Sequence, residues 1–142
     1  MSNIIQTDSC PDYINKFIHM NMEQLMKIYD EGMYENPELG FQEFKTSKHL
    51  VDYIQKNSKS VNYPSHGLET AFDVTFGEDG PLVVICVEYD ALPEIGHACG
   101  HNIIATASIG AGLGLKDIAS KLGIRVKLLG TPAEEGGGGK II

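Results

Sequence analysis

The sequence predicts an α/β fold: a three-layer α/β/α sandwich with a mixed, largely parallel sheet. Two amphipathic helical patterns, over residues 12–34 and 41–56, open the chain. Later, an apolar run at 82–88, a Gly/Ala-rich segment at 103–121 and a β-branched run at 125–129 form a β-α-β unit. Because such a crossover joins parallel strands, the loops after both strands leave the same edge of the sheet, where ligands usually bind.

The composition is typical of a soluble globular protein and excludes nucleic-acid binding. The 142 residues suffice for one domain, and 42% of them are hydrophobic while 21% are charged. A formal charge of −8 without a Lys/Arg cluster leaves no basic face for phosphates. No signal-peptide pattern opens the chain and no long apolar stretch follows, so we expect a cytoplasmic location and no membrane.

The two N-terminal helices are separated by a break. Pro37 disfavours helix at the residue before it, and Gly40 permits a turn. His19 and His49 lie within the helical patterns, where a structural or exposed role is expected.

An alternating pattern at 71–76 predicts a half-exposed strand, and the glycines of 77–81 predict a turn into the apolar strand. We therefore expect an antiparallel hairpin. Cys86 is expected to be a buried hydrophobe, and His66 to have no catalytic role. The odd count of three cysteines argues against a disulfide framework.

The helix at 103–121 contains three glycines, Gly110, Gly112 and Gly114, which would let it approach the sheet closely despite their low helix propensity. Gly123 is expected to end it before the strand at 125–129.

The loop at 88–102 holds most of the metal-capable side chains: Asp90, His97, Cys99 and His101. Cysteine and histidine with a carboxylate suit a borderline-soft divalent metal, although Cys-x-His alone is a weak pattern.

The loop after 125–129 adds Glu134 and Glu135. A hydrolytic metal site needs one carboxylate to bind the ion and one to take a proton from activated water. Alternatives are a Glu pair at a helix N-terminus, a simply buried Cys99, and a Cys99 nucleophile with His101 as base; residues two apart aim poorly at one another.

Four motifs resemble those of the aminoacylase and carboxypeptidase family of zinc-dependent amidohydrolases, the M20 peptidases. These motifs are Asn36 to Glu43, Tyr89 to Pro93, His97 to Asn102 and Pro132 to Gly139. The branch with aminobenzoyl-glutamate hydrolases, auxin-conjugate hydrolases and Xaa-Arg dipeptidases is the most similar. The resemblance implies a zinc-exopeptidase-like fold and metal-dependent hydrolysis of an amide bond in a dipeptide or N-acyl amino acid. It also implies zinc or manganese as cofactor and a homodimeric full-length form.

The resemblance also assigns roles. Cys99, His101 and Glu135 are expected to be metal ligands, Glu134 the general acid/base, and Asp90 a residue that orients a ligand.

Two positions vary between branches. Glu88 stands where related branches have a ligand histidine, and Asn102 replaces the aspartate of auxin-type members, which points to the aminobenzoyl-glutamate and Xaa-Arg subgroup.

The family's remaining histidine ligands and its dimerisation domain lie further downstream than residue 142. We therefore expect 1–142 to be the N-terminal part of a metallo-amidohydrolase catalytic domain, inactive as this fragment. The alternative is a non-catalytic truncated product that binds metal weakly or serves as an interaction module.

Overall fold

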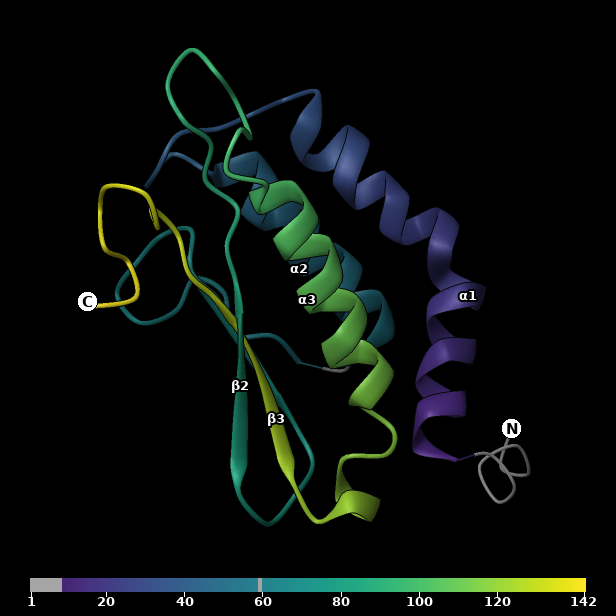
Figure 1. Ribbon diagram of the computed structural model, residues 1–142. Helices are drawn as coiled ribbons and strands as arrows, with labels where there is room; N and C mark the ends of the chain where they lie inside the picture. Colours follow the sequence, from purple (N-terminus) through teal and green to yellow (C-terminus); the bar gives the residue numbers. More distant parts are fainter. Residues whose placement is uncertain (1–8, 59) are drawn as a thin grey trace.

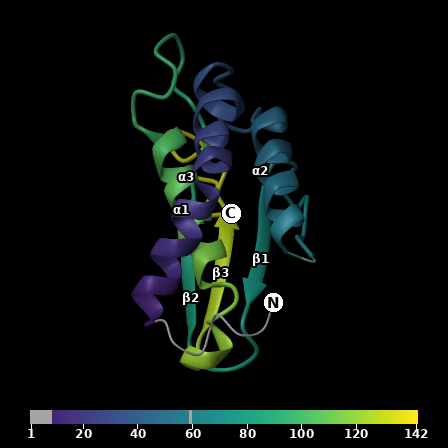
Figure 2. The same ribbon diagram turned by 90° about the vertical axis from the view of Figure 1, so that its right-hand side faces the viewer.

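In the computed structural model, which describes residues 9–58 and 60–142, the helices cover one face of a mixed sheet (Figures 1 and 2). The elements in chain order are α1 (Cys10–Tyr29), the π-helical η1 (Asp30–Tyr34), α2 (Phe44–Asn57), β1 (Phe72–Phe76), β2 (Leu82–Val87), α3 (His101–Leu115), the 3-10 helix η2 (Ser120–Leu122) and β3 (Arg125–Gly130). The α/β class is confirmed. The described residues form two layers, however, and contribute no helix to the other face of the sheet.

Side-chain oxygens accept hydrogen bonds from backbone amides in the first turn of each N-terminal helix. The Ser9 hydroxyl accepts a hydrogen bond from the Asp12 amide, and Pro11 occupies the first turn of α1. α2 starts at Phe44 rather than at 41, because the Glu38 carboxylate accepts hydrogen bonds from the amides of its first turn. The segment between the two helices is thus anchored to the start of α2.

The sheet has the strand order β1-β3-β2 among the described residues. β2 and β3 are parallel, with Leu82 opposite Arg125 and Val87 opposite Gly130, as the β-α-β pattern predicts. β1 pairs with β3 in the antiparallel sense.

The predicted hairpin between 71–76 and 82–88 is therefore wrong, because β3 lies between these strands. The turn that joins β1 to β2 lies against the backbone just before and at the start of β3. A Cβ atom would lie 2.3 Å from the Ile124 carbonyl oxygen if added to Gly77, and 1.9 Å from that of Gly123 if added to Gly80. A side chain at either position would collide with the backbone just before β3, so both positions require glycine. β3 then lies between β1 and β2, and its backbone has hydrogen-bonding partners on both sides.

The helix layer packs on the sheet through small residues of α3. A Cβ on Gly112 would lie 2.4 Å from a methyl of the fully buried Leu128, so this glycine sets the distance between helix and sheet. Gly110 and Gly114 instead face α1: Gly110 lies against Ile18, and Gly114 lies against Ile14. Only one of the three glycines thus has the sheet-facing role expected for all of them.

The opposite face of the sheet is open in the described part of the chain. Leu82, Val84 and Cys86 are exposed along β2, and Lys127 pairs with Asp73 at 3.2 Å beside them. The expectation that Cys86 is buried is wrong: strand alternation points it away from the helices. No helix among the described residues is long and apolar enough to cross a membrane.

Candidate metal centre

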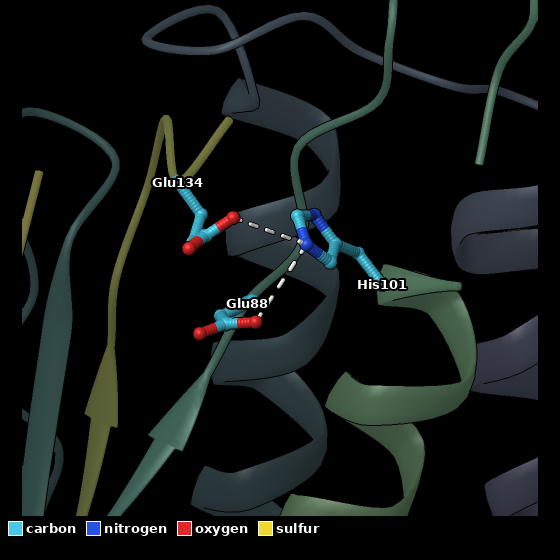
Figure 3. A group of neighbouring side chains, drawn as sticks. All are labelled: Glu88, His101 and Glu134. Carbon is cyan, nitrogen blue, oxygen red and sulfur yellow. Dashed lines mark ion pairs between the residues drawn. The ribbon is translucent and has the colours of Figure 1, made fainter. Parts of the chain in front are cut away.

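The carboxyl ends of β2 and β3 meet at one edge of the sheet, and both chemistry-bearing loops leave from there. Val87 pairs with Gly130, so the chain continues into Glu88 on one side and toward Glu134 on the other (Figure 3). The parallel register thus brings together residues about 45 positions apart in sequence, as the sequence predicts.

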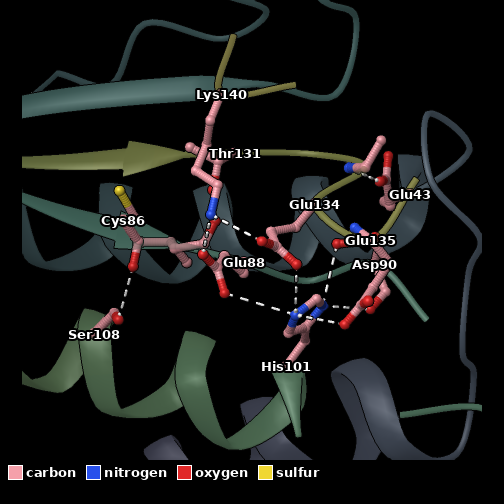
Figure 4. A network of polar contacts seen from close by, with 12 residues as sticks. Glu43, Cys86, Glu88, Asp90, His101, Ser108, Thr131, Glu134, Glu135 and Lys140 are labelled. Atoms are coloured by element: carbon pink, nitrogen blue, oxygen red, sulfur yellow. Dashed lines mark hydrogen bonds and ion pairs between the residues drawn. The ribbon is translucent and has the colours of Figure 1, made fainter. Parts of the chain in front are cut away.

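His101 lies at the centre of this edge. It opens α3 after Gly100, whose left-handed conformation (φ 80°) turns the loop into the helix. Its side chain is only 3% exposed. Its Nε2 atom lies 3.6 Å from Glu88 Oε2, 3.7 Å from Glu134 Oε2 and 3.6 Å from Glu135 Oε1 (Figure 4).

Candidate ligand atoms of Glu88, His101 and Glu134 lie within 4.8 Å of one another. An imidazole nitrogen with several carboxylate oxygens is a donor set that suits zinc or manganese. Carboxylates at this separation repel one another unless a cation lies between them. The arrangement therefore fits a divalent cation.

Asp90 fixes the orientation of His101. The His101 Nδ1 atom lies 2.8 Å from the Asp90 carbonyl oxygen and 3.1 Å from its carboxylate, and Asp90 is almost fully buried. In the tautomer with the proton on Nδ1, the ring donates a hydrogen bond to the Asp90 carbonyl oxygen, and the Nε2 lone pair faces the three glutamates. The second Asp90 oxygen accepts a hydrogen bond of 3.0 Å from the Glu135 amide. Asp90 thus connects the two loops.

Cys99 lies at the margin of the site. It is exposed, and the Glu135 carboxylate beside it raises the pKa of its thiol. Cys99 is not among the three residues of the described chain whose candidate ligand atoms converge. A metal binds the thiolate form of a cysteine. The negative charge of Glu135 disfavours the Cys99 thiolate until a cation neutralises that charge.

Two participants were not assigned from the sequence: Glu88, treated as a replacement for a histidine, and Lys140. The Lys140 ammonium lies 2.7 Å from Glu88 Oε1 and 3.1 Å from Glu134 Oε1, and these carboxylates raise its pKa (Figure 4). The position of Glu88 directly after an apolar strand was a usable signal. Nothing in the pattern around Lys140 indicated its contacts.

His97 lies in the same loop but not in this cluster. Burial lowers the pKa of its imidazole, with His101 as a second cause.

A cavity of about 510 Å³ opens beside the cluster. Asp90 and Glu135 contribute to its wall, together with apolar side chains that include Leu39, Phe41 and Leu92. Its volume and mixed lining are typical of a small-molecule pocket.

No family model matches the sequence. Mouse Xaa-Arg dipeptidase is 39% identical over 124 residues, which cover 78% of this chain and 29% of the relative. One component of the p-aminobenzoyl-glutamate hydrolase of Escherichia coli is 29% identical over 147 residues, which cover 90% of this chain and 30% of that relative.

Solved structures also match most of the chain. A dinuclear metal-binding peptidase of the M20 family from Bacillus subtilis superposes with a TM-score of 0.60 at 25% identity, covering 89% of this chain and 37% of its own. A putative aminohydrolase from Staphylococcus aureus has the same fold, with a TM-score of 0.70 at 21% identity over 87% of this chain and 35% of its own. The chain is a relative of the M20 peptidase family, homologous to about 30% of the length of Xaa-Arg dipeptidase and aminobenzoyl-glutamate hydrolase.

Proposed function

We propose that this chain forms part of the active site of a metal-dependent hydrolase that cleaves an amide bond in a dipeptide or an N-acyl amino acid. The observation that carries the proposal is the convergence of three carboxylates on Nε2 of the buried His101, whose other nitrogen is held by Asp90. The similarity to Xaa-Arg dipeptidase supports the substrate class.

In this proposal Cys99, His101 and Glu135 hold zinc or manganese, with Glu88 within reach of the same nitrogen. When bound, the ion acts as a Lewis acid that lowers the pKa of a water molecule and polarises the amide carbonyl. Further ligands would come from other parts of a longer protein, which accords with the chain spanning about 30% of its curated relatives.

Glu134 acts as the general base and acid. Its carboxylate, 3.7 Å from the His101 nitrogen, takes the proton of the attacking water and then delivers it to the leaving amine. Asp90 keeps His101 in one orientation and holds the Glu135 amide, so that both ligands keep their places. The cavity beside Asp90 and Glu135 receives the substrate.

The two glutamates give the sharpest test, because both lie at nearly the same distance from His101. In a complete enzyme of the length of the relatives, Glu134→Gln should retain metal but lose about 10²-fold to 10⁴-fold in hydrolysis. Glu135→Gln should instead lower metal affinity. Metal content after dialysis and hydrolysis of dipeptides and N-acyl amino acids are measured side by side, with Cys99→Ala and His101→Ala as ligand controls.

Unchanged metal content in both Cys99→Ala and His101→Ala would remove the site assignment. A fully active, metal-loaded Glu134→Gln would disprove the role of Glu134. We further propose a cytoplasmic location, and a homodimer for a form of the length of the relatives.

A further inference from the structure

Glu43 is a buried carboxylate outside the metal centre. Its side chain is 0% exposed and lies at the start of α2. Burial raises its pKa, while hydrogen bonds lower it. A carboxylate is costly to bury unless it is well hydrogen-bonded, and an apolar residue of similar size would fill the same space without that cost. Its presence therefore calls for a specific contact.

That contact is the backbone of the loop with the paired glutamates. Glu43 Oε1 accepts a hydrogen bond of 2.8 Å from the Ala133 amide, 90 positions later in the chain. Figure 4 shows the Glu43 side chain beside the loop that carries Glu134 and Glu135. Ala133 has a left-handed conformation (φ 53°) that is unusual for a residue with a Cβ atom. Its carbonyl accepts hydrogen bonds from the amides of Gly137 and Gly138. Both polar groups of Ala133 are thus fixed at the point where the chain turns toward Glu134.

The glutamate pair is held at two points of its backbone. Asp90 binds the Glu135 amide, within the pair, at 3.0 Å, and Glu43 binds the Ala133 amide just before it. Glu43 is in turn kept in place by the Thr70 hydroxyl, which donates to its other oxygen at 2.9 Å. The support is continuous from the interior of the fold to the metal centre.

We propose that Glu43 is a positioning residue for the metal centre: by holding the Ala133 amide, it directs Glu134 and Glu135 toward His101. It touches neither metal nor substrate. This inference rests on the proposed function in so far as that function gives the glutamate pair its task.

The test compares three variants of the purified chain. Glu43→Ala removes the acceptor, and its zinc affinity should fall by about 10-fold to 100-fold, as when other residues that orient ligands are lost. Glu43→Gln keeps a side-chain carbonyl for the Ala133 amide and should recover most of the affinity. Leu50→Ala is the matched control, because Leu50 is also fully buried on α2. It should destabilise the fold while folded molecules keep wild-type zinc affinity.

A second measurement needs no metal. The amide proton resonance of Ala133 should move upfield in Glu43→Gln, because a neutral acceptor forms a weaker hydrogen bond. Leu50→Ala should leave that resonance in place. This readout decides the inference even if Glu43→Ala does not fold.

An unchanged Ala133 resonance in Glu43→Gln would overturn the inference, as would equal losses of zinc affinity in Glu43→Ala and Leu50→Ala. If Cys99→Ala and His101→Ala bind zinc as the wild type does while the resonance moves as expected, the proposed function fails and the positioning contact stands.

Discussion

Removing the Lys140 ammonium should strengthen metal binding. Lys140 neutralises Glu88 and Glu134, two carboxylates that face the His101 nitrogen. A divalent cation entering between these groups has to displace the ammonium. Lys140→Ala removes this competitor, so zinc and manganese should bind more tightly.

The size of the effect follows from the two ion pairs. The Lys140 side chain is 36% exposed, and Glu88 and Glu134 are 16% and 29% exposed, so solvent screens both pairs. Pairs of this kind contribute about 0.2–1 kcal/mol each. About 1.4 kcal/mol corresponds to a tenfold change in affinity. If the metal no longer has to break either ion pair, its affinity should therefore increase by about 2-fold to 30-fold.

The assay is competition for zinc with a chromophoric chelator, repeated at two salt concentrations. Lys116→Ala is the control, because it makes the same change in net charge while its partner, Asp117, lies just beyond the C-terminal end of α3, away from His101. The gain in Lys140→Ala should shrink at high salt, as a screened interaction does. If Lys140→Ala binds zinc no more tightly than Lys116→Ala, Lys140 does not compete with the metal.

Two further predictions concern stability. Gly112→Ala should be less stable than Gly114→Ala by about 1–3 kcal/mol in urea denaturation. The new Cβ at position 112 would lie 2.4 Å from Leu128, whereas the new Cβ at position 114 would lie 3.4 Å from the nearest atom of α1. Equal stability of the two variants would show that α3 can move away from the sheet without cost. Burial, followed by the Asp117 carboxylate, raises the pKa of Tyr13 to about 12 from 10.0. The stabilisation is therefore present below pH 10 and lost as the pH rises toward 12, so the urea midpoint should fall less over that interval in Tyr13→Phe than in the wild type.

The parallel pairing of β2 and β3 could be predicted from local sequence. The segment between Val87 and Arg125 is long enough for a crossover helix, and its composition is helical. A helical crossover returns the chain in the same direction, so Glu88 and Glu134 had to emerge at one edge. The place of the site therefore follows from local patterns alone.

The predicted hairpin between β1 and β2 was wrong because strand pairing there depends on a distant segment and not on local sequence. The glycines Gly77 and Gly80 correctly indicate a turn, but turn residues specify only that the chain reverses. Whether the two strands then pair depends on a third strand more than 40 residues later. β3 inserts between them because it can pair along both of its edges there. The sequence around the turn therefore cannot show whether β1 pairs with β2 or with β3.

Short-range patterns were enough to specify which chemical groups reach the edge of the sheet: His101 and Asp90 in one loop, Glu134 and Glu135 in the other. Residue type and strand direction suffice for that, because both can be inferred from a few neighbouring positions.

Which atoms converge, in contrast, depends on how the distant segments pack. The folded chain places Glu88 and Lys140 against Glu134, leaves Cys99 at the exposed margin, and joins Glu43 to Ala133 across 90 positions. Such contacts require loop conformations and side-chain directions that are set by packing of segments far apart in the chain, and the spacing of residues along the sequence does not contain them.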